Sequence, residues 1–414
     1  MITARGRAAL AAGSVARWAS RVTGRGAGAM IGGLVAMTLD RSILGQLGRG
    51  RRNVVVTGTN GKSTTTRMTA AALATLGPGT AVATNAEGAN MDAGLIAALA
   101  QDRAAGLSAL EVDEMHVPHV ADATDPAVIV LLNLSRDQLD RVGEINHIER
   151  TLRAGLGRHP GSVIVANCDD VLMTSAAYDN PHVVWVAAGG GWSGDSVSCP
   201  RSGEVIVRDG SSWYSTGTDF KRPSPHWWFD DETLYGPNGL AVSMQLALPG
   251  AVNRGNAAQA VAAAVALGAD PAAAVAAVSS VDEVAGRYRT VQLGAHRVRI
   301  LLAKNPAGWQ EALSMVDPGA DGVVITVNGQ VPDGEDLSWL WDVNFEHFVD
   351  RPVVAAGERG TDLAVRLGYA GVGHTLVHDT IEAIASCPPG QVEVVANYTA
   401  FLHLNRVLEK SAHV

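Results

Sequence analysis

Short apolar runs alternate with helical stretches along most of the chain. After an apolar run at 54–56, residues 63–76 have helical spacing and good helix formers. Further strand-like runs lie at 80–83, 107–112, 128–132, 163–166 and 183–186. Because strands and helices alternate, we predict a parallel sheet joined by right-handed crossovers.

The second half of the chain breaks this pattern and then resumes it. Residues 195–245 show short alternating segments, turn residues and three tryptophans, which predict a small antiparallel insert. Alanine-rich helices at 253–267 and 271–278 come next. Strands at 298–302, 322–327, 352–356 and 392–395, with a helix at 308–316, then restart the alternation.

These patterns predict an α/β protein of two domains with a helical start. Residues 1–50 read as one or two helices rich in alanine and glycine. Residues 51–290 form the predicted central domain with its parallel sheet and its insert at about 195–245. Residues 291–414 form a second, Rossmann-like α/β domain.

Charge is distributed unevenly along the chain, whose net charge is −9. Residues 1–52 contain nine arginines and a single acid, Asp40, so this segment is near +8. Such a segment can contact anionic lipid headgroups or nucleic acid, or it can be a solvated helix face. The acidic remainder argues against a nucleic-acid-binding protein.

Cysteines and apolar runs indicate the compartment. Three widely spaced cysteines imply no disulfide framework, which fits a reducing cytoplasm. Arginines are scattered through the first apolar stretch, unlike in a signal peptide. The uncharged run Gly26–Leu39 is short and rich in glycine, so we do not expect it to span a membrane.

A phosphate-binding loop is the clearest motif. The sequence Thr-Gly-Thr-Asn-Gly-Lys-Ser at 57–63 lies between a predicted strand and a predicted helix. Its glycines allow a tight turn that points N–H groups at an anion, beside a helix N-terminus. The lysine can reach terminal phosphates, and the serine hydroxyl suits Mg²⁺. We assign ATP to Gly58, Thr59, Asn60, Gly61, Lys62, Ser63 and Thr64; the alternative is a chance glycine turn.

Acidic residues close the predicted strand at 107–112. Glu111 and Glu114 stand at the carboxyl end of this strand, where ligands bind in parallel sheets. One of them could hold a Mg²⁺ ion that bridges ATP phosphates. The alternative is a solvated helix start.

The loop lacks the usual first glycine, which is Val56, and so resembles the ATP loop of the Mur ligase superfamily. This resemblance implies activation of a carboxylate as an acyl phosphate, which an amine then attacks. Glu111 matches the superfamily's glutamate at the end of a strand. The segment Asn133–Arg141 resembles another family motif, with Gln138 at the position of a metal-binding histidine, which weakens a second metal site.

Several later segments resemble the MurT-like ligase subunits of lipid II isoglutaminyl synthase. They are 84–90, 133–144, 248–256, 304–308, 339–346 and 396–399. The resemblance implies ATP-dependent amidation of the α-carboxylate of D-glutamate in lipid II, with ammonia from a separate GatD glutaminase. No cysteine has a nucleophile-elbow context, which agrees with an external ammonia source. The alternatives are a stand-alone Mur-type amino-acid ligase and a non-catalytic nucleotide-binding scaffold.

The same resemblance suggests further site residues. Asp342, or alternatively Asp336, would complete a Cys–His–Asp arrangement with the glutaminase; a helix cap is the other reading of Asp342. Asn253 and Asn256 would contact the nucleotide base, and Arg287 would reach the phosphates on domain closure. Substrate contacts are assigned to Asn85, Asn90, Lys304 and Asn305.

The insert bears on metal content. Many MurT-like sequences carry a four-cysteine zinc ribbon here, but this chain keeps only Cys199, with Ser215 and Thr218 where cysteines are expected. A structural zinc needs about four such ligands, so we predict no zinc. We expect a cytoplasmic protein, with attachment to the inner membrane face through the basic N-terminus as a hypothesis.

Overall fold

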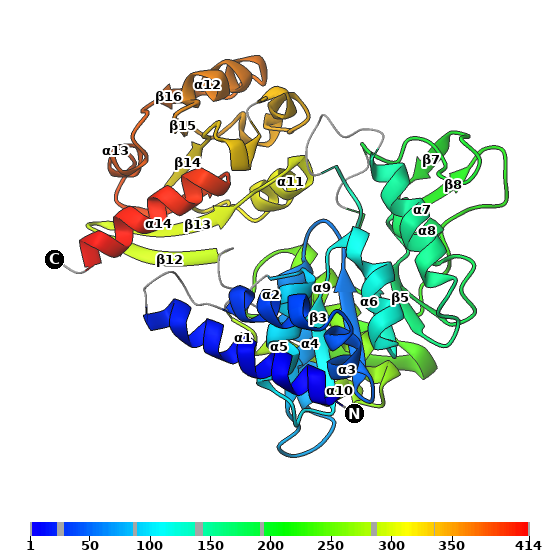
Figure 1. Cartoon of the computed structure of the whole chain (residues 1–414). Helices are drawn as coiled ribbons and strands as arrows, with labels where there is room; N and C mark the ends of the chain where they lie inside the picture. Colours follow the sequence, from blue (N-terminus) through cyan, green and yellow to red (C-terminus); the bar gives the residue numbers. More distant parts are fainter. Residues whose placement is uncertain are drawn as a thin grey trace. The chain divides into compact units, whose positions relative to one another are not determined.

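The chain folds into two compact units, described here from a computed structural model (Figure 1). The structure describes residues 2–22, 29–85, 89–136, 144–190, 194–282, 288–334 and 336–412. The first unit comprises 1–134 and 143–282, and the second comprises 135–142 and 283–414. The N-terminal helices therefore belong to the first unit, although the sequence analysis set residues 1–50 apart.

A six-stranded parallel sheet organises the first unit in the order β2-β3-β1-β4-β5-β6. Its central strands are buried on both faces, which explains their continuous apolar runs. The strands are β1 Arg52–Thr57, β2 Val82–Thr84, β3 Leu107–Glu111, β4 Val128–Leu131, β5 Val163–Asn167 and β6 Val183–Val186. The predicted parallel sheet is confirmed.

Helices cover this sheet and bury its apolar side chains. The N-terminal segment contributes three of them, α1 Ala4–Val22, α2 Ala29–Leu39 and α3 Ile43–Gly48. The others are α4 Lys62–Ala74, α5 Asp92–Gln101, α6 Val117–Thr124, α7 Glu144–Leu156, α8 Val171–Ala177, α9 Ala251–Ala266 and α10 Pro271–Ser279. One large core joins side chains of α1, α2, α3 and α5 to α8 with the sheet. Helices α4, α9 and α10 pack against one another.

The insert consists of two small antiparallel sheets, as the alternation predicted. One pairs β7 Ile206–Asp209 with β8 Ser212–Ser215; the other joins β9 Trp228–Phe229, β10 Thr233–Gly236 and β11 Leu240–Ser243. Trp213 anchors the insert, because its indole N–H donates to the carbonyl of Cys168 at 2.9 Å. Arg222 adds an ion pair with Asp169 at 2.6 Å.

The second unit holds a six-stranded sheet in the order β12-β13-β17-β14-β15-β16. Only the pairing of β12 with β13 is antiparallel. The strands are β12 Tyr288–Leu293, β13 His296–Leu302, β14 Gly322–Thr326, β15 Val353–Ala356, β16 His374–Leu376 and β17 Gly390–Ala396. The helices are α11 Pro306–Ser314, α12 Gly360–Tyr369, α13 Thr380–Ala385 and α14 Tyr398–Ala412. The two edge strands, β12 and β16, were not predicted.

Asp170 begins helix α8 as its N-cap. Its carboxylate accepts the N–H of Met173 at 2.8 Å and that of Leu134 at 3.1 Å. Burial raises the pKa of Asp170 to about 6, although these hydrogen bonds act in the opposite direction. The folded-state pKa thus exceeds the ordinary value of 3.8. Because the folded state then binds more protons between these values, the contribution of Asp170 to stability falls as the pH rises through this window.

We therefore expect Asp170→Asn to flatten the pH dependence of folding. Between pH 4 and pH 7, the free energy of unfolding of the unmodified protein should fall by about 2–3 kcal/mol relative to that of the variant. Urea titrations at a series of pH values measure this difference. Asp209→Asn, at an exposed position of β7, is the matched control. Parallel pH profiles for the unmodified protein and Asp170→Asn would contradict the expectation.

Candidate active site

The phosphate loop connects the buried strand β1 to helix α4, as predicted. Gly58 has φ 145° and Gly61 has φ 84°, a backbone region that favours glycine. A Cβ atom at Gly58 would lie 2.8 Å from the Cβ of Leu132. Gly61 is the N-cap of α4, so the helix begins at Lys62 and its N-terminal N–H groups face the loop. Both glycines are therefore required by the turn itself.

Asn133, which follows β4, clamps the loop. Its side-chain oxygen accepts the N–H of Asn60 at 2.9 Å, and its side-chain nitrogen donates to the carbonyl of Asn60 at 3.0 Å. Its own carbonyl accepts the N–H of Thr59 at 2.9 Å. These three bonds fix the centre of the loop to the neighbouring strand. Asn133 belongs to a predicted family motif but was not among the predicted site residues.

Glu111 stands on the other side of β1, at the end of β3. Its register partner in β1 is Val56, which directly precedes the loop residues 57–63. The Asn85 side chain holds the Glu111 backbone: it accepts the N–H of Glu111 and donates to its carbonyl, each at 2.8 Å. Asn85 also donates to the carbonyl of Ala89 at 2.9 Å. The geometry gives Asn85 a positioning role, and its assignment to substrate stays a prediction.

Lys62 is folded back onto its own loop. Its ammonium group donates to the carbonyl of Gly58 at 2.5 Å and to that of Thr59 at 3.2 Å. It also forms an ion pair with Glu114 at 3.5 Å, where both side chains are almost buried. Glu114 belongs to η1 (Glu114–His116), directly after β3. Of the two predicted acids, Glu114 is therefore the partner of Lys62.

Helix α9 presents a polar face to the loop and to β4. The side-chain oxygen of Asn256 would lie 2.7 Å from a Cβ atom added at Gly61, so this amide contacts the loop. Gln259 donates to the carbonyl of Leu131 at 2.9 Å, and Asn253 donates to that of Pro249 at 2.6 Å. Asn253 and Asn256 thus lie on the phosphate-loop side of α9, and their contact with a base stays a prediction. Gln259 was not predicted.

The donor set at the loop suits Mg²⁺. Glu111 Oε2 is buried and accepts no hydrogen bond from the described part of the chain. Such an orphaned carboxylate oxygen fits a hard cation, which prefers oxygen ligands. Within the described ranges, no three side chains among His, Cys, Asp and Glu gather around a metal position. Mg²⁺ does not require such a group, because it is commonly held by one or two protein oxygens together with phosphates and water.

The predicted residues of the second unit have different surroundings. Asn305 is the N-cap of α11 and accepts the N–H of Gly308 at 2.8 Å. The Lys304 ammonium lies over the Tyr398 ring, 5.0 Å from its centroid. For Asn90 in the first unit, the backbone carbonyl accepts the N–H of Asp113 at 3.2 Å. Substrate contact by these residues stays a prediction. Arg287 and Gln138 lie outside the described residues.

Asp342 follows the helical turn η5 (Ser338–Trp341) and does not cap the next turn, η6 (Glu346–Phe348), whose N-cap is Phe345. Its Oδ2 atom is buried without a hydrogen-bond partner among the described residues and lies 4.0 Å from the Arg136 guanidinium. Asp336, the alternative, accepts the N–H of Ser338 at 2.8 Å. Asp342 therefore has a carboxylate oxygen that can accept a further hydrogen bond, whereas Asp336 already accepts one within the helical turn.

Cys199 in the insert is surrounded by hydrogen-bond donors. Burial raises the pKa of this thiol, but hydrogen bonds from the Ser202 hydroxyl and from the backbone of Arg201 and Ser202 outweigh burial and hold the pKa below its ordinary value. Ser202 stands where a Cys-x-x-Cys zinc motif would have its second cysteine, and its hydroxyl forms a hydrogen bond with the Cys199 sulfur. Cys199 packs with Trp213, Phe220 and Ile206, so apolar contacts hold this part of the insert together.

Changing Asn133 should weaken nucleotide binding through the loop. Asn133→Ala removes both side-chain bonds to Asn60, and we expect the KM for ATP to rise about tenfold, since each bond is worth roughly 0.5–1.5 kcal/mol. Asn133→Asp should be worse, because its second oxygen would face the carbonyl of Asn60 and its charge would oppose phosphate. Steady-state kinetics over a range of ATP concentrations test this. Equal KM values in the three proteins would exclude the clamp.

The family described as Mur ligase middle domain matches residues 56–264, half of the chain, including the loop, β3 and α9. The chain belongs to the Mur ligase family. A second family, MurT ligase C-terminal, matches residues 302–401 of the second unit. The Mur ligase match thus covers the phosphate-loop assembly, and the other covers Asp342.

Relatives of this Mur ligase family member resemble it over nearly its whole length. One is the lipid II isoglutaminyl synthase (glutamine-hydrolyzing) subunit MurT of Streptococcus pneumoniae, 27% identical over 92% of this chain and 93% of the relative. The MurT subunit of Staphylococcus aureus is 26% identical over 96% of both chains. Among solved structures, a pseudomurein peptide ligase type C from Methanothermus fervidus has the same fold. Its TM-score is 0.67 at 18% identity, over 89% of this chain and 81% of that one.

Proposed function

We propose that this chain is the ligase subunit of a lipid II isoglutaminyl synthase. It would use ATP to convert the α-carboxylate of D-glutamate in the lipid II stem peptide into an amide, giving D-isoglutamine. The similarity to subunits of that name over more than nine-tenths of both chains carries this proposal. The phosphate loop and the acid beside it supply the chemistry that such a reaction needs.

The reaction proceeds in two transfers. A carboxylate oxygen of the substrate attacks the γ-phosphorus of ATP, the bond to ADP breaks, and an acyl phosphate forms. Ammonia then attacks the acyl carbon, phosphate leaves with the electron pair of the C–O bond, and the nitrogen loses a proton. Charge builds up on phosphate oxygens in the first step, which is where preorganised cations and N–H donors lower the barrier.

Residues of the first unit fit these roles. Lys62, released from the carbonyls of Gly58 and Thr59, is placed to bind the terminal phosphates. Ser63 and Glu111 would hold Mg²⁺, with Glu114 as a further ligand. That ion would neutralise phosphate charge when bound. The N–H groups of the loop, held by Asn133, bind the phosphate oxygens.

Ammonia would come from a GatD-type glutaminase subunit. All three cysteines of the chain are buried, and burial raises the pKa of the Cys168 thiol to about 12 and also that of Cys387. Cys199 lies inside the insert. None of these thiols therefore fits the accessible nucleophile of a glutaminase. A partner chain has to supply that nucleophile.

The partner would dock on the second unit near Asp342. Beside this residue, the Trp341 side chain is 56% exposed and that of Tyr369 is 77% exposed. Their rings meet edge to face with centroids 5.3 Å apart. Exposed aromatic side chains that are fixed by a neighbour are typical anchors of protein interfaces. Asp342 would orient the catalytic histidine of the glutaminase and stabilise its charged form.

The substrate places the reaction at a membrane surface. No helix in the described ranges has the length and apolar character needed to cross a bilayer. We propose that the protein works in the cytoplasm and attaches peripherally to the inner face of the membrane, where lipid II is exposed.

Reconstitution with a GatD-type glutaminase tests the proposed function. Incubation with lipid II, ATP, Mg²⁺ and glutamine should yield a product in which one hydroxyl is replaced by an amino group, as read by mass spectrometry. Ammonium salts should replace glutamine and the glutaminase. Addition of a free amino acid in place of ammonia would instead support a stand-alone ligase, and normal product formation by Lys62→Ala would support a non-catalytic scaffold.

A further inference from the structure

Helices α1 and α2 are fixed to the first unit by small residues. A Cβ atom added at Gly13 would collide with the carbonyl of Gly32, and one added at Gly33 would collide with that of Ala93 in α5. Leu10 and Ala36 point inward and join the large core. The two helices therefore cross closely and lie directly on α5. Their inward faces are occupied by packing within the first unit.

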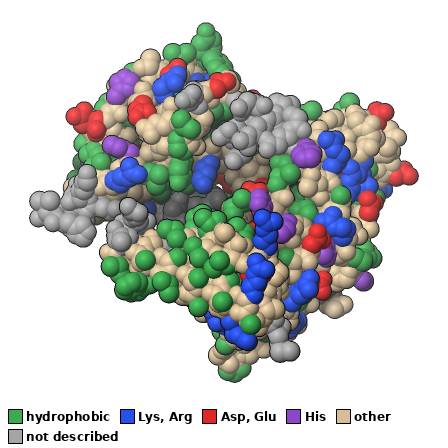
Figure 2. Space-filling view, viewed as in Figure 1, with side chains coloured by type: hydrophobic (Ala, Val, Ile, Leu, Met, Phe, Trp, Pro, Cys, Tyr) green, Lys and Arg blue, Asp and Glu red, His purple; other side chains and the backbone are tan. Residues whose placement is uncertain are grey.

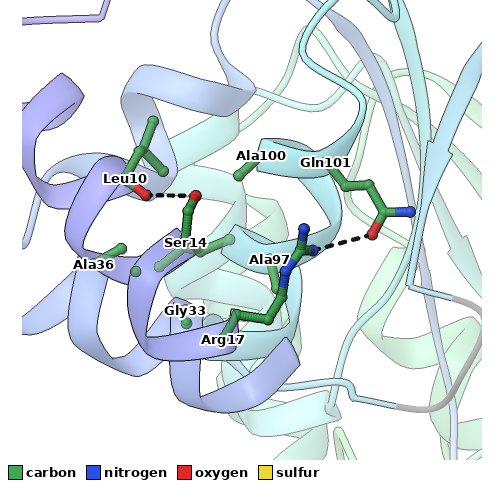
Figure 3. Close-up of a pocket in the computed structure, with 11 residues that line it drawn as sticks. Leu10, Ser14, Arg17, Gly33, Ala36, Ala97, Ala100 and Gln101 are labelled. Carbon is green, nitrogen blue, oxygen red and sulfur yellow. Dashed lines mark hydrogen bonds between the residues drawn. The ribbon is translucent and has the colours of Figure 1, made fainter. Parts of the chain in front are cut away.

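A small hollow lies between α1, α2 and α5 (Figure 3). Its volume is about 50 Å³, and it is lined mainly by Gly, Ala and Ser, with Arg17 donating to Gln101 at 3.5 Å at one side. A hollow of this size has room for a few water molecules.

The outer surface of α1 and α2 is apolar. On α1 the outward residues Ala4, Ala8, Ala11, Val15, Trp18 and Val22 are spaced by four and three positions, so they form one line along the helix. Figure 2 shows hydrophobic side chains gathered over α1 and α2. Seven large ones stand 41–67% exposed: Val15, Trp18, Val22, Met30, Ile31, Leu34 and Leu39. A helix face open to water ordinarily carries charged residues instead. We call these seven side chains the α1–α2 surface.

Cationic groups accompany the α1–α2 surface. Residues 1–52 contain nine arginines and only one acidic residue, Asp40. That acid is engaged by the Ser42 hydroxyl and the Gln46 amide, at 2.7 and 2.8 Å. Arg5 donates to the carbonyl of Leu39 at 2.8 Å, which holds its guanidinium at the end of α2, and Arg7 is exposed on α1. The region thus combines exposed apolar side chains, a tryptophan and a net positive charge.

We propose that the α1–α2 surface docks on the anionic face of a lipid bilayer. The apolar side chains would enter the boundary between headgroups and acyl chains, with Trp18 at headgroup level and the arginines on lipid phosphates. A second copy of this chain is a poor occupant, because it would bring a segment of the same charge, near +8, against this one. The biological purpose rests on the proposed function, since a lipid-linked substrate requires the enzyme at the membrane.

Co-sedimentation of the full chain with lipid vesicles tests the inference. At low salt, most of the protein should co-sediment with vesicles of equal parts phosphatidylglycerol and phosphatidylcholine. A much smaller fraction should co-sediment with vesicles of pure phosphatidylcholine. The double variant Trp18→Ser/Leu34→Ser should bind the anionic vesicles at least about tenfold less tightly, because two large side chains no longer leave water. Arg7→Gln/Arg41→Gln changes two exposed arginines, of which Arg41 lies between α2 and α3. This variant should lose a similar factor and much of the salt dependence.

Matched controls make the result decisive. Val197→Ser/Tyr214→Ser removes two comparably exposed apolar side chains from the insert and should leave vesicle binding unchanged. Unchanged thermal unfolding of each variant shows that the fold is intact. Failure of the unmodified protein to bind anionic vesicles overturns the proposal. Vesicle binding by Trp18→Ser/Leu34→Ser as tight as that of the unmodified protein also overturns it. The same holds if this variant keeps vesicle binding but loses glutaminase capture or self-association.

The test also separates this inference from the proposed function. Amidation of a water-soluble lipid II analogue with a truncated lipid reports the chemistry without a membrane. Activity on that analogue together with no vesicle binding would overturn the docking surface alone. Vesicle binding together with no amidation of either substrate would overturn the function and leave the docking surface standing.

Discussion

Lys62→Ala is expected to lower the rate of amide formation by about 10²–10³-fold or more. Removal of one preorganised donor at a developing negative charge costs about this much, and Lys62 carries a full charge. The loop itself should keep its shape, because Asn133 and the glycines hold it independently of the lysine. Measured turnover of lipid II at saturating ATP, with either glutamine or ammonium as the nitrogen source, tests this.

A stability effect has to be separated from this catalytic one. Lys62→Ala removes the ion pair between Lys62 and the nearly buried Glu114 carboxylate, which destabilises the fold. Lys62→Ala/Glu114→Gln removes that charge, so it should regain stability while staying inactive. Lys221→Ala, at an exposed position of the insert, is the control for loss of a lysine. Recovery of activity in the double variant would show that Lys62 acts only through folding.

Asp342→Asn should abolish glutamine-driven amidation and spare ammonium-driven amidation. An asparagine keeps the size of the side chain but cannot stabilise a charged histidine of the partner. The corresponding substitution in a serine-protease triad lowers turnover about 10⁴-fold, so a loss of about 10²–10⁴-fold in glutaminase rate is expected. Glutamate release by the reconstituted complex measures it. The phosphate-loop chemistry in the first unit is unchanged by this substitution.

Asp336→Asn is the matched control for that experiment. The asparagine oxygen can still accept the N–H of Ser338, so the helical turn should persist and the glutaminase rate should change little. If the loss appears in Asp336→Asn instead, the alternative residue holds the role. If Asp342→Asn also loses ammonium-driven amidation, the residue is not specific to the glutaminase.

The phosphate loop, the parallel sheet of the first unit and most parallel strands of the second unit were predictable because their signals are local. A buried parallel strand is a continuous apolar run, and a glycine turn before a helix is readable over seven residues. The edge strands were not predicted because they lack such a local signal. β16 has three residues without an apolar run, and β12 pairs antiparallel with β13 through a turn at Gly294, whose φ is 58°.

The asparagines show where the sequence alone is insufficient. Asn85 and Asn133 satisfy backbone groups at the ends of neighbouring strands, and in the second unit Asn397 clamps the backbone of Asn328 in the same way, at 2.7 and 3.0 Å. Which backbone groups need a partner depends on the strand order β2-β3-β1-β4-β5-β6, which no local pattern encodes. An amide that can bind a purine can equally complete a sheet.

The all-arginine charge of residues 1–52 has a consequence for regulation. This segment contains neither lysine nor histidine. Guanidinium groups stay protonated throughout the physiological pH range, and they are not substrates for lysine acetylation. The charge of these arginines is therefore insensitive to pH in the physiological range and to lysine acetylation. Ionic strength and the anionic content of the opposing surface are the two variables that control the attraction this charge exerts.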